Sequence, residues 1–566
     1  MKQLFSVFVG SLVLIIFVMC SEIKAQVYDY LDVTPGYETL NLAISGDTTA
    51  TGDPKSVNRV YRLKRNEVYL LNGTVTNVKG NVLRIFAEEG TGRIPMIMAA
   101  ADLSGTSYRC FAPEADAHFK NIYISGRNNL GIYTDDSKDM IRLQEVGITI
   151  ELDSCFLEHE WKDFVRMNAS DQSVIIKNSI LRNAGDLADA SDNQFIDTRS
   201  QVQKLIKVQN STLYVATGRA FRSGGGAFFK DFILDHCTFY QIGNGDGMRG
   251  AVDSAETPLF AVERGQNVTV TNNIFMDVVF HGDEINSYEV DDTLDYPLFG
   301  FLSLNNPSIP DDTRNIVLQN NAHGTTQALL DYYKTQNDTV KPPVFLNKYS
   351  LNTYFNRYPQ TWKYENNFVE RVEFTDAPPP DPVVAYTAYR RACGFCETGV
   401  PEFWADRNGI GENPDTWGPA TDEYEFSYNT SANAYTAGDK GFPLGDLNWW
   451  PELKKLWEAG GTVGVEDNVN NIPIDFALEQ NHPNPFNPST KISYTVPRLT
   501  NVSLTVFNIL GQEVATLVNN QVQNAGKYSA TWNAKDFTGN TVSSGIYMYQ
   551  LNADNILISK KMLLMK

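Results

Sequence analysis

Five arginines recur at the ends of short apolar stretches in the middle of the chain, at Arg142, Arg166, Arg199, Arg222 and Arg264. If these stretches stack as strands about 4.8 Å apart, the guanidinium groups form a stripe about 20 Å long. Cations stacked at that spacing repel one another unless anions lie between them. The pattern therefore predicts an anion partner for the stripe.

Two sources of anions remain open. Asp197 and Glu263 stand beside the arginines in sequence and could neutralise them within the protein. A ligand with regularly spaced carboxylates or sulfates could do the same, because arginine offers a two-pronged donor to such groups. Acidic polysaccharides have this form.

A basic constellation surrounds the glycine-rich turn of residues 218–231, with Arg219, Arg222 and Lys230 as candidate catalytic residues. In β-elimination from a uronate, a cation neutralises the carboxylate, and a lysine or arginine with a lowered pKa removes the C5 proton. A turn of this composition is also common as plain structure, so that alternative stays open. Arg142, Arg166, Arg199 and Arg264 are the candidate substrate-binding residues.

Acidic residues offer two further kinds of chemistry. Oxygen ligands for Ca²⁺ could come from Asp246, Glu263, Asp283 and Glu284. Paired carboxylates for glycoside hydrolysis could come from Asp186, Asp189, Asp192, Asp197, Asp283 and Glu284. Such acidic runs are often solvated loops. The histidines at 159, 236, 281 and 323 lack metal-ligand spacing, and His281 is the one followed by paired carboxylates.

The elements that would position these residues form a repeat. Its turn column contains Ser154, Asn178, Asn210, His236, Asn272, Asn320 and Asn366, at intervals of 24, 32, 26, 36, 48 and 46 residues. Two residues before this column stand Leu152, Ile176, Val208, Leu234, Val270 and Leu318, and a further apolar column lies two residues before those. Alternation of period two predicts strands with one buried face, and asparagine favours a left-handed turn.

A constant turn with insertions of variable length is typical of a solenoid. A meandering antiparallel sheet is the alternative, although it would not require the same turn residue at the same offset. Stacked strands predict a ladder of asparagine amides at the turn column. They also place Cys155 and Cys237 in one column three strands apart, which is too far for a disulfide, so we expect free thiols.

The asparagine ladder over roughly residues 60–370 resembles the pectate-lyase-like right-handed parallel β-helix superfamily. The resemblance implies an all-β fold, and it leaves activity open because the superfamily includes lyases, hydrolases, esterases and adhesins. It does not extend to the local sequences around the lysine and arginine of the β-helix lyases.

Beyond residue 370 the repeat ends at a proline-rich break, residues 376–382. Five tryptophans follow, at 404, 417, 449, 450 and 457, and predict an irregular aromatic cap over the last coil. A platform for stacking sugars is the alternative role. Cys393 and Cys396 have the spacing of a local disulfide or of half a metal site. Residues 459–474 read as a linker.

The last part of the chain alternates as strands of a small antiparallel sandwich. Asn484-Pro-Phe-Asn-Pro-Ser489, the stretch 507–512, Ser544-Gly-Ile-Tyr547 and the basic pair Lys560-Lys561 resemble a type IX secretion sorting domain. The resemblance implies that an outer-membrane exporter is a partner and that the protein is released or fixed at the cell surface.

Composition and the first residues agree with export. Residues 1–25 combine an early lysine, an apolar run and a small residue at the end, as in a secretory signal peptide that directs export through the periplasm. No second apolar run is long enough to suggest a span in the mature chain. The net charge of −20 argues against nucleic acid as a partner.

The resulting prediction is a signal peptide (1–25), a β-helix (26–375), an aromatic cap (376–458), a linker (459–474) and a sorting domain (475–566). The predicted function is engagement of acidic polysaccharide, with cleavage by β-elimination if the protein is an enzyme. A non-catalytic adhesin or glycan-capture protein and a glycoside hydrolase are the alternatives.

Overall fold

The computed structural model describes residues 27–565 except 79, 132–138, 186–192, 200, 223–227, 244–264, 282, 285–296, 300, 302–308, 337–339, 394–398, 403, 406–423, 464–475, 497–499, 524–525 and 554–555. The predicted signal peptide and residues 464–474 of the predicted linker lie outside these residues. Contacts divide the chain into two compact units, residues 1–434 with 444–450 and residues 435–443 with 451–566. No helix in the described ranges combines the length and apolarity needed to cross a membrane.

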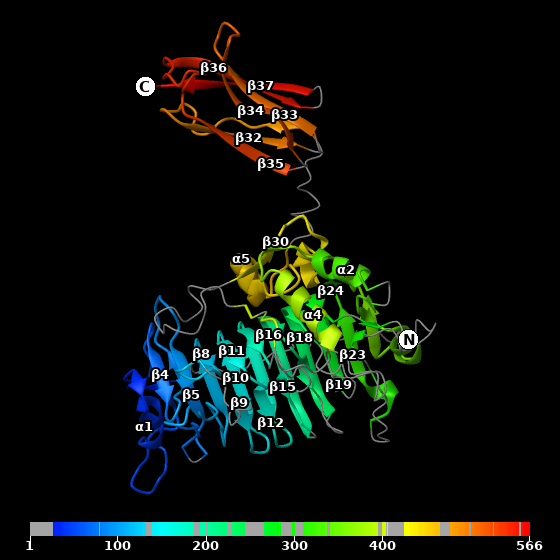
Figure 1. Ribbon diagram of the computed structural model, residues 1–566. Helices are drawn as coiled ribbons and strands as arrows, with labels where there is room; N and C mark the ends of the chain where they lie inside the picture. The colour runs from blue at the N-terminus through cyan, green and yellow to red at the C-terminus, as the bar shows by residue number, and fades with distance from the viewer. Residues whose placement is uncertain are drawn as a thin grey trace, which may run out of the picture. The chain divides into compact units, whose positions relative to one another are not determined.

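The first unit is built on parallel strands that lie side by side (Figure 1). One ladder contains β1 (Asp29–Val33), β3 (Arg59–Leu63), β5 (Leu83–Ala87), β7 (Ala117–Lys120), β10 (Thr149–Asp153), β13 (Ser173–Lys177), β16 (Val202–Ala216), β18 (Phe228–Ile242), β19 (Gly265–Thr271), β23 (Asn315–Gln319) and β27 (Trp362–Glu365). Each strand pairs in parallel with the one before and the one after it in this series. The antiparallel meander is therefore wrong.

A second parallel ladder alternates with the first along the chain. It contains β2 (Gly36–Tyr37), β4 (Val68–Leu71), β6 (Met96–Ala99), β8 (Tyr123–Ser125), β11 (Phe156–Glu160), β14 (Ile180–Ala184), the second halves of β16 and β18, β20 (Ile274–Val278), β24 (Ala322–Gly324) and β28 (Phe368–Val369). A separate parallel sheet has the order β9 (Asp139–Leu143), β12 (Asp163–Met167), β15 (Gln194–Asp197) and β17 (Arg219–Arg222).

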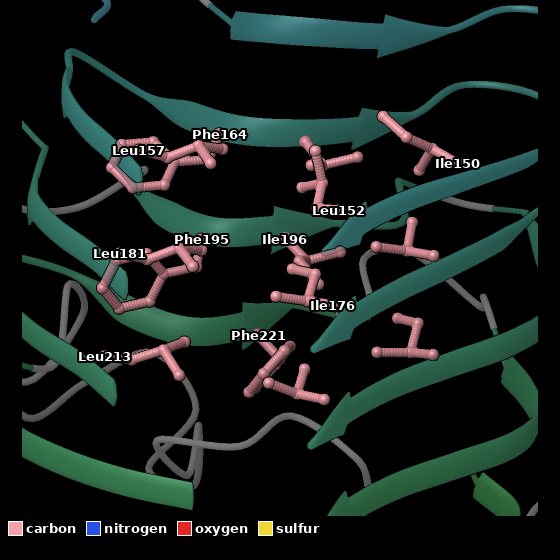
Figure 2. Close-up of a cluster of buried hydrophobic side chains, with 14 of the residues drawn as sticks. Ile150, Leu152, Leu157, Phe164, Ile176, Leu181, Phe195, Ile196, Leu213 and Phe221 are labelled. Carbon is pink, nitrogen blue, oxygen red and sulfur yellow. The ribbon is translucent and has the colours of Figure 1, made fainter. Parts of the chain in front are cut away.

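The register confirms the predicted apolar column. Leu152 pairs with Ile176, which pairs with Val208, and the series continues through Leu234, Val270 and Leu318. All six side chains are fully buried. Figure 2 shows the same stacking in other columns, with Leu157, Leu181 and Leu213 lying one above the next and Phe164 above Phe195. The rings of Phe164 and Phe195 meet edge to face at 5.3 Å.

The predicted turn column is confirmed in conformation. Ser154, Asn178, Asn210, His236, Asn272, Asn320 and Asn366 all have left-handed backbone angles, with φ between 46° and 63°. Asn121 belongs to the same series one strand earlier and was missed. A second left-handed series, at His159, Asn183, Val215, Gln241 and Asp277, bends the second ladder and was also missed. Asparagine signals only one of these five positions.

The buried amide ladder lies one residue beyond the predicted turn column. Asn273 Nδ2 donates to Asn321 Oδ1 at 2.9 Å, and Asn321 Nδ2 donates to Asn367 Oδ1 at 2.8 Å. Turn-column amides also bond to one another, Asn320 Nδ2 to Asn272 Oδ1 at 3.5 Å and Asn366 Nδ2 to Asn320 Oδ1 at 3.2 Å. The predicted ladder is therefore confirmed for these three residues, and the buried ladder beside it was missed.

Serine and cysteine extend this buried column toward the N-terminus. The backbone N–H of Cys155 donates to Ser179 Oγ, and the N–H of Ser179 donates to Ser211 Oγ. Ser211 pairs with Cys237, so the two cysteines are three strands apart as predicted. Both thiols are free and buried, and burial raises the pKa of Cys155 to about 12. Of the pair Cys393 and Cys396, the second lies outside the described residues, and the side chain of the first is not described.

The chain after β28 packs against the side of the second ladder. The antiparallel pair β29 (Phe374–Asp376) and β30 (Glu425–Tyr428) brings Phe426 to Tyr214 and Tyr240. Trp449 Nε1 donates to Thr212 Oγ1 at 3.0 Å, and the ring of Trp404 lies against His159. A cap over the last coil is therefore wrong for Trp404 and Trp449. Trp417 lies outside the described residues.

Helices border the first unit. α1 (Thr39–Ser45) buries Leu40 and Ile44 beside the first strands. At the last coil, α3 (Lys348–Ser350) and η5 (Leu351–Phe355) bring Tyr354 over Trp362, with the two rings stacked at 4.9 Å. α2 (Gln327–Lys334) and α4 (Asp381–Cys393) lie next to each other. Short pairs are formed by β21 (Asp283–Glu284) with β25 (Val340–Lys341) and by β22 (Pro297–Phe299) with β26 (Val344–Leu346).

The second unit contains an antiparallel sandwich, as predicted. One sheet has β31 (Ala477–Leu478), β32 (Thr490–Val496) and β35 (Gly526–Trp532), and the other has the order β34 (Glu513–Gln523), β33 (Thr500–Phe507), β36 (Gly545–Ala553) and β37 (Ile556–Leu564). Their inner faces share one core with Ile492, Leu504, Tyr549 and Leu551. The unit also contains α5 (Pro451–Glu458).

The buried amide ladder gives a direct test. Asn321→Ala removes the oxygen that accepts the N–H of Asn273 at 3.0 Å and the donor to Val270 and Gln319. Because these partners become unsatisfied in the interior, we expect the free energy of unfolding to fall by about 2–4 kcal/mol. Asn315→Ala, at an exposed position of the preceding strand β23, should cost less than about 0.5 kcal/mol. Urea unfolding followed by tryptophan fluorescence measures both. Equal losses would contradict a role for the ladder.

Candidate functional site

The separate parallel sheet of β9, β12, β15 and β17, here called the arginine–aspartate sheet, places three predicted arginines in one register column. Arg142 pairs with Arg166, Arg166 with Asp197, and Asp197 with Arg222. Arg199 does not lie in this column, since it follows β15 with a left-handed φ of 49°. Its place in the column is taken by Asp197. Arg264 lies outside the described residues.

A second register column contains carboxylates that the sequence analysis missed. Asp139 pairs with Asp163, Asp163 with Gln194, and Gln194 with Arg219. Both aspartates are almost fully buried. The missed signal is the pattern Asp-x-x-Arg, which occurs at 139–142 and again at 163–166, the same interval of 24 residues as the first two turns.

Asp139 is the centre of an ion-pair network. Arg142 Nε donates to its carboxylate at 2.9 Å, Arg166 Nη1 lies 3.1 Å away, and Arg109 Nε lies 3.0 Å away. A buried carboxylate with three guanidinium neighbours separates cations that would otherwise repel one another. Internal carboxylates therefore neutralise part of the arginine stripe.

Asp197 is one of the two internal anions proposed from the sequence. It forms an ion pair with Arg199, whose Nε lies 3.0 Å from Asp197 Oδ2, and the same oxygen lies 4.0 Å from Arg166 Nε. Its side chain is fully buried, whereas that of Arg199 is 36% exposed. The prediction for Asp197 as an ion-pair partner is confirmed. Glu263, the other one, lies outside the described residues.

Among the described residues on and around the sheet, arginines outnumber carboxyl groups. The residues that the structure describes there include six arginines and four carboxyl groups, namely Arg109, Arg142, Arg166, Arg199, Arg219 and Arg222 with Asp139, Asp163, Asp197 and Glu160. Burial raises the pKa of both Asp163 and Glu160 well above their usual range, and neighbouring carboxylates raise it further. Protonation of these two groups increases the positive excess.

The predicted catalytic residues are in different sheets. Lys230 is in β18 of the first ladder, and its Nζ lies 2.6 Å from Asp171 Oδ1 with both side chains about half exposed. Arg219 and Arg222 are the first and last residues of β17 in the arginine–aspartate sheet. The stretch between them and Lys230 lies partly outside the described residues.

Two of the four predicted metal ligands, Asp246 and Glu263, lie outside the described residues, as do Asp186, Asp189 and Asp192. The other two, Asp283 and Glu284, form β21, with side chains that are not described. Within the described part of the chain, no three His, Cys, Asp or Glu side chains are grouped as metal ligands.

A buried polar group lies where β20 ends near α2 and α4. Burial raises the pKa of Asp277 to about 7, although its Oδ1 accepts the N–H of Thr326 at 2.6 Å. Burial, with the nearby charges of Arg390 and Arg391, lowers the pKa of His281 to about 3. Neither ring nitrogen of His281 has a hydrogen-bond partner among the described residues. Near neutral pH the carboxyl group of Asp277 is therefore partly protonated.

Comparison with known proteins identifies the end of the chain. Residues 481–565 match the model of the secretion system C-terminal sorting domain. No curated protein matches this chain. Among solved structures, the chain is similar to PorZ, an essential bacterial surface component of the type-IX secretion system of the human oral bacterium Porphyromonas gingivalis.

The similarity to PorZ is small, at 15% identity and a TM-score of 0.12, and it covers 19% of this chain and 13% of that one. The conclusion therefore rests on the sorting domain. The protein is exported, is secreted or attached to the cell surface, and interacts with the type IX secretion machinery through its C-terminal domain.

The network around Asp139 gives a prediction. In Asp139→Asn, Arg109, Arg142 and Arg166 lose the anion that they share, so we expect the free energy of unfolding to fall by about 3–5 kcal/mol at pH 7. Asp171→Asn, which removes the half-exposed partner of Lys230, should leave the free energy of unfolding nearly unchanged, because exposed ion pairs contribute little. Chemical denaturation measures both. A loss in Asp139→Asn no larger than in the control would contradict the central role of Asp139.

Asp277 gives a pH-dependent prediction. The carboxyl ionises near 3.8 when the chain is unfolded and near 7 when it is folded, so stability falls between pH 4 and 7 and is constant above that range. Asp277→Asn removes this titration and keeps the acceptor for Thr326. We expect the variant to exceed the wild type by about 1–4 kcal/mol at pH 8, with the gap closing toward pH 4. Thermal unfolding at several pH values measures it, with Asp331→Asn on the surface of α2 as the unchanged control. A constant gap at all pH values would contradict the assignment.

Proposed function

We propose that the first unit is a right-handed parallel β-helix that binds acidic polysaccharide at the arginine–aspartate sheet. The β-helix is supported by two parallel ladders whose strands alternate along the chain, each moving forward by one strand per repeat. Left-handed corners at constant register join the ladders, as expected for successive coils. The sheet of β9, β12, β15 and β17 then forms a further face of the same coils.

The observation that carries the binding proposal is the excess of guanidinium groups over carboxylates on this sheet. The whole chain has a charge of −20, so an anionic ligand is repelled by most of the protein and attracted to this face. Arg142 and Arg199 have side chains that are 22% and 36% exposed, and Arg222 is also partly exposed. They can reach a ligand while their inner groups stay fixed.

The buried carboxylates prepare these arginines for binding. Asp139 orients Arg142 through its Nε, and Asp197 orients Arg199. An arginine fixed in this way loses little side-chain entropy when it binds a carboxylate or sulfate. Neighbouring strands repeat at about 4.8 Å, close to the length of a sugar unit, so a polymer along the coil axis could meet successive arginines.

Capture without cleavage is the reading that the site favours. A lysine base for β-elimination must lose its proton, whereas Nζ of Lys230 pairs with Asp171, in a different sheet from Arg219 and Arg222. The carboxyl groups near the arginines are buried, which suits structure better than acid–base work on a bound sugar. Ca²⁺ held by Asp246, Glu263, Asp283 and Glu284 belongs to the alternative of β-elimination.

Binding is tested with Arg142→Gln, Arg199→Gln and Arg222→Gln combined in one variant. Titration with pectate, alginate and chondroitin sulfate should show at least one ligand whose affinity falls about tenfold or more in the variant and falls with added salt. Arg62→Gln, at a 38% exposed arginine of β3 paired with Asp32, is the matched control. Unchanged affinity in the triple variant, or no binding of the wild type to any of the three, would sink the proposal.

Cleavage is tested on the same polymers by ultraviolet absorbance and by release of reducing ends. Capture predicts binding with neither signal, with Ca²⁺ added or chelated. New absorbance would identify a lyase, and reducing ends without absorbance would identify a hydrolase.

A further inference from the structure

The sorting domain has an apolar area on the outer face of its four-stranded sheet. Pairing places Met548 between Phe507 and Lys561, and places Ile546 opposite Leu563. Ile546 is 52% exposed, Met548 44% and Leu563 37%. These residues, Phe507, Ile546, Met548, Lys561 and Leu563, are here called the apolar face.

The exposure of this face is not a sign of poorly packed strands. Along β36 the exposed residues alternate with Tyr547 and Tyr549, which point into the core, and along β37 Leu563 stands between the buried Met562 and Leu564. The turn after β33 adds Ile509 and Leu510, each more than 70% exposed. Several large apolar side chains held together on a rigid sheet are typical of a binding surface.

The other sheet of the sandwich is different. Its paired outward residues are Lys491 with Thr531 and Ser493 with Ser529, all polar. The two outer faces therefore differ in character within one small domain, and only the four-stranded sheet offers an apolar area among the residues that the structure describes. The comparison therefore places the candidate binding surface on the outer face of the four-stranded sheet.

Charge adds a second, independent observation. Residues 476–566 have seven Lys or Arg and four Asp or Glu, a net charge of +3, although the whole chain has −20. Lys561 lies inside the apolar face and Lys560 is next to it. A partner with an apolar centre and acidic groups at its edge would match both properties.

We propose that the apolar face is the surface by which the sorting domain docks onto a protein component of the exporter. The match to a secretion sorting domain supports a protein as the occupant. The exporter must distinguish chains with a sorting signal from other exported chains. A rigid face with one central lysine provides that selectivity. The proposal rests on the sorting domain and is independent of glycan binding.

The test is export of the full chain in a bacterium with a type IX exporter. Ile546→Asp with Leu563→Asp places two charges in the centre of the face, and the exported fraction should fall about tenfold or more. Ser493→Asp with Thr531→Asp puts the same charges on the opposite sheet and should change export less than about twofold. Thermal unfolding of each purified chain checks that the domain still folds.

Milder variants keep the test decisive if the double variant unfolds. Met548→Ser and Lys561→Glu should each reduce export, and a charge reversal at Lys491 should not. Equal export of the face variants and the wild type would overturn the proposal, as would equal loss in the opposite-sheet control. Wild-type binding to anionic lipid vesicles that these variants abolish would instead assign the face to a membrane surface, and dissociation of a dimer by the variants would assign it to a second copy.

Discussion

Backbone hydrogen bonding between parallel strands in constant register is the constraint on which the first unit depends. Each strand of the two ladders satisfies its N–H and C=O groups on strands one repeat before and after it, so the side chains of equivalent residues must stack. The columns of Leu152 and Asn321 are consequences of that register. Similar side chains in contact are favourable when they are apolar or when amides can bond to each other. Stacked side chains of like charge are unfavourable. In the arginine–aspartate sheet of this protein, aspartates placed between the arginines offset that repulsion.

There, the stacking rule and electrostatics act against each other. Arg142 lies directly above Arg166 in register, and the fold tolerates this because Asp139 is shared between them and Asp197 replaces the next arginine in the column. Buried ion pairs of this type seldom raise stability over an apolar core, but breaking one is costly. A sheet built in this way holds its outer guanidiniums in fixed positions.

Much of this architecture could be predicted from one sequence. The turn column was identifiable because asparagine is one of the few residues that adopts left-handed angles readily, and all seven predicted positions have such angles. The second corner could not be found in the same way, since it uses residues as different as His159 and Val215, whose conformation is imposed by packing. The turn-column amide ladder was predicted, but the buried ladder beside it was missed because Asn272 and Asn273 are adjacent and composition does not tell which one points inward. Asp139 and Asp163 were missed although their spacing to the arginines repeats, and Lys230 was grouped with Arg219 because nearness along the chain does not mean a shared sheet.

The left-handed corners separate two properties of the repeat: the strand register, which is constant, and the length of the connecting segments, which varies. Intervals between successive turns range from 24 to 48 residues, yet the paired strands on both sides keep their register. Loop closure costs grow slowly with length, so an added segment between coils perturbs the scaffold little. Such a frame can acquire new peptide excursions one at a time, by gene insertion, without rebuilding its interior. Joined to an export signal, it is a natural vehicle for displaying foreign segments outside the cell.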